Sequence, residues 1–263
     1  MSKNFYTRLF FATVLLILLG INSQLSVSWV YYILLVLAYV SIAGLGSYFI
    51  QLNFFLYSYC KGETTKKQIA LTFDDGPFAN FTPQILDILK VENVSATFFL
   101  IGKNVEGNEN LLLRMLAEGH VIGSHSFNHA FWFSMQGRAK MVRDLLLGNK
   151  AIHAATGKYP SFFRPPYGVT NPTVAAAIKA QNLVSIGWSV RTYDTNVKSA
   201  ETLLARALKN LENGDIILFH DWGKYTIDVL PLLITQVKAR GFNFVSMDKL
   251  IGRPAYNDKP KAN

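Results

Sequence analysis

The sequence predicts an α/β domain, built as a barrel or a doubly wound sheet, behind an N-terminal membrane segment. From Gln68 onward, short apolar runs alternate with longer amphipathic stretches, which is the strand and helix pattern of such folds. No charged residue occurs between Arg8 and Lys61, and almost all of the charge lies beyond Lys61. Half of the 263 residues are hydrophobic, which is enough to bury a core.

The uncharged N-terminal region contains two apolar runs. The run from Trp29 to Ile50 is long enough to cross a hydrocarbon core as a helix. The run from Leu9 to Ile21 has the length of a signal-peptide core, but no small-x-small cleavage site follows it. We therefore favour a two-helix transmembrane hairpin over a cleaved signal peptide, and we predict that residues 1–60 form a membrane anchor.

The charges that flank the hairpin bear on its orientation. Lys3 and Arg8 precede it, Lys61, Lys66 and Lys67 follow it, and the loop between the two apolar runs carries no charge. The positive-inside rule then places both flanks, and the domain, in the cytoplasm. If only one segment spans the membrane, or if the first is removed, the domain faces outward, so the sequence leaves the side of the membrane open.

Residues 61–263 are predicted to form one domain, because no internal repeat or low-complexity linker divides them. Seven strands are predicted from the short apolar runs: Ile69–Phe73, Ala96–Ile101, Val121–Ser124, Ser161–Arg164, Val184–Ser189, Asp215–Phe219 and Asn243–Val245. Six helices are predicted from the amphipathic stretches between them: Thr82–Glu92, Glu109–Glu118, Gly137–Ala155, Pro172–Ala180, Ala200–Glu212 and Ile227–Arg240.

Charge and cysteine content exclude several classes of function. The net charge of +9 comes from scattered residues, and no basic run with interleaved aromatic residues indicates a nucleic-acid partner. Cys60 is the only cysteine, which excludes a disulfide framework and a thiolate metal cluster. We interpret Cys60 as an inert thiol rather than a palmitoylated one.

Two adjacent carboxylates end the first predicted strand, in the motif Thr72-Phe73-Asp74-Asp75-Gly76-Pro77. Neighbouring residues on an extended turn point in different directions. One aspartate can therefore hold a metal ion while the other stays free to take a proton.

His125 and His129 follow the third predicted strand and stand four residues apart. One helical turn would bring both imidazoles to one face. Two histidines and one carboxylate make a divalent-metal site with a position left for water. Such a pair is common by chance, but its place after a strand that follows the aspartate pair favours a ligand role.

A third histidine, His220, ends the predicted strand Asp215–Phe219. A histidine held there can donate a proton to a departing amine, although an isolated one is more often a structural residue of the core. His120 and His153 have no comparable setting, and we interpret them as structural.

The sequence Arg164-Pro165-Pro166-Tyr167-Gly168 ends the fourth predicted strand in a stiff turn. Such a turn can direct a backbone N–H at a developing oxyanion. Arg164 can also pair with Asp74 and keep that carboxylate ionised. An ordinary proline-glycine loop with a surface arginine is the alternative.

Taken together and in this order, the four motifs resemble those of the NodB-type polysaccharide deacetylases, carbohydrate esterase family 4. The resemblance covers roughly Lys67 to Leu250. It implies a distorted (β/α) barrel with about seven parallel strands, and metal-dependent removal of N- or O-acetyl groups from sugars.

Residue by residue, the resemblance assigns a role to each motif position. It implies that Asp74 is the general base and that a metal ion, commonly zinc, is bound by Asp75, His125 and His129. It also implies an orienting role for Arg164, an oxyanion contact from the Tyr167 backbone N–H, a pocket for the acetyl methyl group at Leu218, and a general acid at His220.

One stretch departs from the family pattern, which has a tryptophan and then Asp-x-x-Asp-Trp. Here Trp188 is followed by Arg191 in place of the first aspartate and by Thr195 in place of the second tryptophan. Asp194 is retained, and we expect it to tether Arg164. The departure predicts an altered substrate choice, because it leaves the predicted metal, base and acid positions intact.

The predicted function is removal of N-acetyl groups from N-acetylglucosamine-type sugars in peptidoglycan, a chitin-like polymer or an exopolysaccharide. The apolar segments favour one alternative, a deacetylase or deformylase of a lipid-linked sugar at the membrane face. Another is a membrane-tethered carbohydrate-binding pseudoenzyme, against which the intact Asp74, His129 and His220 argue. The predicted partners are therefore an acetylated glycan or lipid-linked sugar, and the membrane.

Overall fold

Parallel strands form the centre of the domain. The computed structural model describes residues 2–257, so the last six residues of the predicted domain, 258–263, lie outside the described part. The strand order is β1-β7-β6-β4-β3-β2-β9-β8, and β10 pairs with the start of β2. The strands are β1 (Ser58–Tyr59), β2 (Gln68–Asp74), β3 (Thr97–Leu100), β4 (Val121–Ser124), β6 (Phe162–Phe163), β7 (Val184–Ile186), β8 (Val190–Arg191), β9 (Ile216–His220) and β10 (Asn243–Phe244).

The segment from β7 to β8 closes this sheet into a distorted barrel. These strands follow each other in the chain, but β7 pairs with β6 and β1, whereas β8 pairs with β9. Between them, Gly187 donates a backbone hydrogen bond to Tyr59, and Ser189 donates one to Ile216. The prediction of one strand over Val184–Ser189 is therefore wrong, because the segment changes its pairing partner midway.

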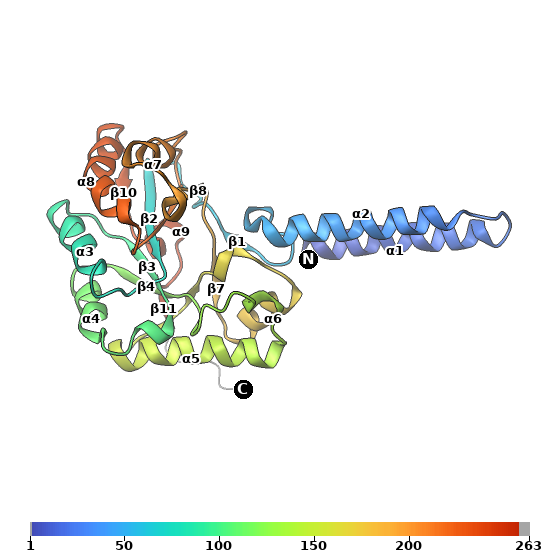
Figure 1. Ribbon diagram of the computed structural model, residues 1–263, viewed down its shortest axis with the longest axis horizontal. Helices are drawn as coiled ribbons and strands as arrows, with labels where there is room; N and C mark the ends of the chain where they lie inside the picture. Colours follow the sequence, from blue (N-terminus) through green and yellow to red (C-terminus); the bar gives the residue numbers. More distant parts are fainter. Residues whose placement is uncertain (1, 258–263) are drawn as a thin grey trace.

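Helices surround the strands on the outside (Figure 1). They are α3 (Thr82–Val91), α4 (Glu109–Ala117), α5 (Arg138–Thr156), α6 (Pro172–Ala180), α7 (Ala200–Ala207) and α8 (Lys224–Ala239). All correspond to predicted helices, but α7 ends five residues before the predicted Glu212. A turn follows it, in which Asn210 takes a φ of 50° that a helix cannot continue.

Short elements without a strong periodic pattern were not predicted. These include β1, β8, the antiparallel pair β5 (Tyr159–Pro160) and β11 (Tyr256–Asn257), and the helix α9 (Met247–Ile251).

Side chains alternate between two faces along the strands, as the period of two requires. On β2, Leu71 and Phe73 pack outward with the helices, while Ala70 packs in the barrel interior with Leu218. Asp74 lies four residues after Ala70, and His220 lies two residues after Leu218, so both belong to the interior face. The strand pattern therefore directs these two polar side chains into the mouth of the barrel.

Two helices, α1 (Lys3–Asn22) and α2 (Trp29–Tyr48), form a hairpin that projects from the domain (Figure 1). Their side chains are mostly exposed, and by length and composition both are apolar enough to cross a membrane. The hairpin meets the domain at its base, where Thr170 donates a backbone hydrogen bond of 3.0 Å to Ser47.

The linker between hairpin and domain is part of the packed structure. Ile50 is buried, and the Gln51 side chain donates a hydrogen bond of 3.2 Å to the Trp188 carbonyl. Strand β1 joins the sheet beside β7, ahead of the predicted domain start at residue 61. Cys60 packs against Gly187, and burial raises the pKa of its thiol to about 11, in keeping with an inert thiol.

Candidate active site

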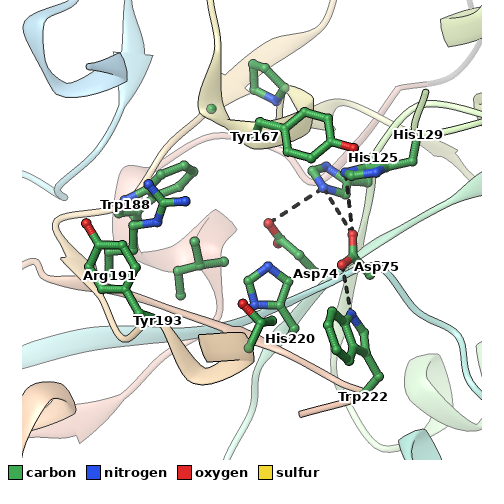
Figure 2. A pocket seen from close by; sticks show the side chains of 14 residues that line it. Asp74, Asp75, His125, His129, Tyr167, Trp188, Arg191, Tyr193, His220 and Trp222 are labelled. Atoms are coloured by element: carbon green, nitrogen blue, oxygen red, sulfur yellow. Dashed lines mark hydrogen bonds and ion pairs between the residues drawn. The ribbon is translucent and has the colours of Figure 1, made fainter. Parts of the chain in front are cut away.

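One pocket lies at the carboxyl ends of the strands (Figure 2). Seven of the nine residues predicted from the sequence line it: Asp74, Asp75, His125, His129, Tyr167, Leu218 and His220. The other two, Arg164 and Asp194, are buried and hydrogen-bonded to residues of this group. Seven further residues complete the lining: Pro165, Gly168, Trp188, Arg191, Tyr193, Thr195 and Trp222.

Asp75, His125 and His129 lie close enough together to hold a metal ion. Oδ1 of Asp75 lies 3.6 Å from Nε2 of His125 and 3.5 Å from Nε2 of His129. Ligand atoms at tetrahedral zinc, bonded at about 2.0–2.2 Å, are about 3.4 Å apart. Within residues 2–257, this buried Oδ1 has no hydrogen-bond partner. Both the spacing and the unpaired oxygen therefore fit a bound divalent metal.

Hydrogen bonds fix the orientation of these ligands. Nδ1 of His125 lies 2.7 Å from the Arg164 carbonyl, which can only accept, so Nε2 keeps its lone pair for a metal. Oδ2 of Asp75 accepts a hydrogen bond of 2.9 Å from the Trp222 indole. Burial, together with the neighbouring His125, lowers the pKa of His129 to about 4, so this ligand is neutral at pH 7.

The prediction that a helical turn joins His125 and His129 is wrong. The chain between them is a loop, in which Ser126 and His129 take φ values of 69° and 49°. The Ser126 hydroxyl accepts from the His129 backbone N–H, and the buried Asp144 accepts from the Phe127 N–H. These local hydrogen bonds replace the backbone hydrogen bonds that a helix would make here. The loop nevertheless places the centroids of the two imidazole rings 4.7 Å apart.

Asp74 is held by a buried arginine, as the sequence predicted. Nη1 of Arg164 donates to Oδ1 of Asp74 at 2.6 Å, and the Arg164 side chain is fully buried. The guanidinium also donates to the Thr72 hydroxyl at 2.9 Å and to the Gly187 carbonyl at 2.8 Å. These hydrogen bonds fix Arg164, which in turn holds the Asp74 carboxylate in one orientation in the pocket.

Asp194 does not tether Arg164, and that expectation is wrong. Its Oδ1 lies 2.8 Å from Nδ1 of His220, and its Oδ2 accepts from the His220 backbone N–H at 2.6 Å. Oδ2 also accepts from the Thr226 hydroxyl at 3.0 Å. Both oxygens are therefore used to position His220 and the start of α8.

His220 is protonated at neutral pH in this setting. Burial alone would lower the pKa of its imidazole, but the hydrogen bond and charge of Asp194 oppose that effect. Together with the charges of Asp74 and Asp75, they raise the pKa of His220 to about 9. A protonated histidine whose side chain is 22% exposed, and which lines the pocket, can donate a proton to a bound substrate.

Tyr167 and Leu218 both line the pocket. Tyr167 takes a φ of 59°, and its backbone N–H makes no hydrogen bond within the described chain. This N–H is therefore available to an oxyanion. The Tyr167 ring packs 4.8 Å from that of His129, and Leu218, only 3% exposed, lines the pocket.

Comparison with known proteins shows the family of the chain. The family model for polysaccharide deacetylases matches residues 61–186. A peptidoglycan-N-acetylglucosamine deacetylase of Bacillus cereus is 37% identical over 204 residues, which cover 74% of this chain and 72% of the relative. The chain belongs to the polysaccharide deacetylase family.

Other relatives in this family carry related names. The peptidoglycan-N-acetylglucosamine deacetylase PgdA of Listeria monocytogenes is 42% identical over 188 residues, which cover 72% of this chain. The chain spans about two fifths of that relative's length, because the match covers 40% of it. The peptidoglycan-N-acetylmuramic acid deacetylase PdaA of Bacillus subtilis is 34% identical, with 72% of this chain and 73% of the relative covered.

Solved structures of the family share the fold. A peptidoglycan N-acetylglucosamine deacetylase crystallised with 4-naphthalen-1-yl-N-oxidanyl-benzamide matches with a TM-score of 0.70 at 34% identity. That match covers 75% of this chain and 94% of the other. A CE4 family pseudoenzyme from Bacillus anthracis matches with a TM-score of 0.68 at 28% identity, covering 73% of this chain and 67% of the other.

In this member of the polysaccharide deacetylase family, the two positions that depart from the family's sequence pattern belong to the pocket wall. Arg191 and Thr195 both line the pocket, beside Trp188 and Tyr193. Sequence reasoning missed the lining roles of Tyr193 and Trp222. Trp222 stands two residues after His220, so an aromatic residue just beyond a strand-end histidine was the available signal.

Proposed function

We propose that this protein removes N-acetyl groups from the amino sugars of peptidoglycan-type glycans and needs a divalent metal to do so. One observation carries the proposal: three kinds of group meet at the same pocket. They are a possible metal-binding group, called here the metal-ligand trio (Asp75, His125 and His129), the Asp74 carboxylate held by Arg164, and the His220 imidazole held by Asp194. The names of the curated relatives support N-acetylglucosamine or N-acetylmuramic acid as the sugar.

The metal bound by Asp75, His125 and His129 would polarise the acetyl oxygen and acidify a water molecule. Two imidazoles and one carboxylate suit zinc, which we propose as the native ion. The neutral state of His129 at pH 7 leaves its nitrogen free for such an ion.

The protein's own groups divide the proton transfers. Asp74, oriented by its contact with Arg164, takes the proton of the attacking water. The unpaired Tyr167 N–H stabilises the negative charge that develops on the acetyl oxygen. His220, protonated through its contact with Asp194, gives a proton to the sugar nitrogen as the carbon–nitrogen bond breaks. The products are acetate and a free amine.

Acetate release tests this function against a carbohydrate-binding pseudoenzyme. Zinc-loaded protein in detergent should release acetate from N-acetylglucosamine oligomers. A chelator should stop the release, and added zinc should restore it. Binding of the oligomers without any acetate release would identify a pseudoenzyme, and release that survives full metal removal would overturn the metal-dependent mechanism.

A second candidate substrate is an N-acetylated sugar linked to a lipid. The favouring observation is that the linker after the apolar hairpin contacts the pocket wall, through the Gln51 hydrogen bond to Trp188. A pocket joined to the base of a membrane hairpin would lie near the membrane face. Topology decides between the substrates: a C-terminal reporter in the cytoplasm excludes mature cell-wall glycan, and one outside the cell disfavours a cytoplasmic lipid-linked precursor.

A further inference from the structure

An unpaired arginine lies on the pocket wall across from the metal-ligand trio. Figure 2 shows Arg191 between Trp188 and Tyr193, on the side of the pocket away from His129. The guanidinium lies 5.4 Å from the Trp188 ring centroid and 4.7 Å from that of Tyr193. Among the residues described, no carboxylate pairs with it, and its side chain is exposed.

A second arginine faces the same aromatic ring. Arg206, on α7, lies with its guanidinium 5.9 Å from the Tyr193 centroid. It too is exposed and has no acidic partner within residues 2–257. Two unpaired positive charges therefore flank Tyr193, which is 51% exposed.

We propose that Arg191, supported by the charge of Arg206, forms an anion-binding subsite that recognises a carboxylate or phosphate carried by the substrate. This inference rests on the proposed function, because it assumes that an acetylated sugar occupies the pocket. It adds that the sugar bears an anionic group on the same or a neighbouring unit.

The backbone around Arg191 is fixed before any ligand binds. Arg191 pairs with Leu218 in the parallel contact of β8 with β9. The next residue, Thr192, donates a hydrogen bond of 2.6 Å to the Leu218 carbonyl. Tyr193 then takes a φ of 55°, a left-handed conformation that non-glycine residues seldom adopt. The arginine therefore starts from a rigid position.

Aromatic contacts hold the guanidinium without using its N–H groups. A planar guanidinium over a ring is stabilised by cation–π attraction, which leaves its five donors free. A carboxylate or phosphate oxygen can use two of these donors at once. Such a site discriminates by charge and geometry together.

The acidic groups of the pocket already have partners. Asp74 is paired with Arg164, Asp194 with His220, and Asp75 belongs to the proposed metal site. Arg191 is thus the cationic side chain of the lining that an incoming anion can reach without displacing an internal partner. This arrangement favours substrate recognition over an internal salt bridge.

Binding of matched sugars tests the subsite. The ligands are neutral N-acetylglucosamine disaccharide, N-acetylglucosaminyl-N-acetylmuramic acid with a free carboxylate, and N-acetylglucosamine 1-phosphate with N-acetylglucosamine as its neutral counterpart. Calorimetry on the zinc-loaded full chain would compare wild type, Arg191→Gln and Arg143→Gln. Arg143 is an exposed residue of α5 outside the pocket lining, so its variant is a control with the same loss of charge.

We expect Arg191→Gln to weaken binding of an anionic sugar about tenfold or more, the usual effect of losing a charge-assisted hydrogen bond. Binding of the neutral sugars should change by less than about twofold, a margin well below the 1.4 kcal/mol that makes a tenfold change. Arg143→Gln should change neither. A loss confined to the carboxylate sugar or to the phosphate sugar identifies the anion.

Three results would overturn the subsite: equal binding of neutral and anionic sugars by wild type, equal losses for both in Arg191→Gln, or no loss for either anion. Equal losses would show that Arg191 stacks on the sugar or supports Trp188. Because this readout is binding, it is separable from the proposed reaction. If the wild-type protein binds the anionic sugars more tightly but releases no acetate from any sugar, the proposed reaction is contradicted and the anion-binding subsite is still supported.

Discussion

The two sides of the pocket are built in different ways. On the catalytic side, Asp74, His125 and Arg164 are each 3% exposed or less, and hydrogen bonds of 2.6–2.7 Å hold them. On the opposite wall, Tyr193 and Arg191 are exposed and meet through ring contacts. The barrel therefore buries and hydrogen-bonds the proposed reacting groups, whereas the opposite wall, from Arg191 at the end of β8 to Tyr193, presents exposed side chains that we propose to contact the substrate.

The largest expected effect lies on the catalytic side. His125→Ala removes one of three ligands and leaves Asp75 and His129 with too few donors for tight zinc binding. We expect loss of stoichiometric zinc by elemental analysis and a fall in kcat of about 10³-fold. His120→Ala is the histidine control, since His120 is a buried residue whose Nδ1 accepts from the Ala96 N–H outside the pocket. Normal zinc content in His125→Ala would show that the trio is not the metal site.

The pH dependence of the reaction tests the proposed pairing of His220 with Asp194. The pKa of His220 is raised to about 9, so its acidic form exists below that pH and is lost as pH rises through it. Activity should therefore fall on the alkaline side near pH 9. The variant Asp194→Asn lacks the carboxylate that raises the pKa of His220. The alkaline limb of its pH-rate profile should therefore move to lower pH, with kcat at pH 8 reduced about 10- to 100-fold.

A pH-rate profile of both proteins, with an NMR titration of His220, checks this shift. Thr226→Val is a suitable control, because it removes one hydrogen bond to Asp194 and keeps the carboxylate. An unchanged alkaline limb in Asp194→Asn would refute the role of Asp194.

Trp222 lies beside Asp75 and should have an intermediate effect. Its indole N–H holds Oδ2 of Asp75, and loss of such an outer hydrogen bond typically costs 10- to 100-fold in metal affinity or activity. We expect Trp222→Phe to weaken zinc binding in a competition titration within that range. Trp132→Phe, at an exposed tryptophan that does not line the pocket, is the control. Equal zinc affinities in the two variants would remove Trp222 from the metal site.

The smallest effect is expected from the linker to the hairpin. Gln51→Ala removes one hydrogen bond to the Trp188 carbonyl, worth about 1 kcal/mol. We expect KM for sugar oligomers to rise about fivefold with kcat nearly unchanged, because Trp188 belongs to the substrate-facing wall. A fall in kcat at constant KM would place the linker on the catalytic side instead.

The same division explains what the sequence could predict. Asp74, Asp75, His125, His129, Arg164, Tyr167, Leu218 and His220 stand in or beside compact motifs at strand ends, and strand periodicity brings them to one end of the barrel. The strong apolar patterns also predicted the main helices and strands. Local motifs and periodicity are therefore sufficient for the barrel and its catalytic side.

Features that depend on tertiary pairing could not be predicted. The break between β7 and β8 arises because the segment changes its pairing partner from β6 to β9. Strand β1 has two residues and is defined by its pairing with β7 rather than by a sequence pattern. The partner of Asp194 was predicted wrongly because Arg164 and His220 both end strands. Sequence spacing does not tell which of these two lies beside Asp194.

The most direct test of the account separates the roles of the two adjacent carboxylates. Zinc content and acetate release are measured together for wild type, Asp74→Asn and Asp75→Asn. We predict that Asp74→Asn keeps its zinc and loses acetate release by about 10²–10⁴-fold, the usual contribution of a general base, whereas Asp75→Asn loses both. An Asp74→Asn protein that releases acetate at the wild-type rate, or that loses zinc as Asp75→Asn does, would contradict the division of roles.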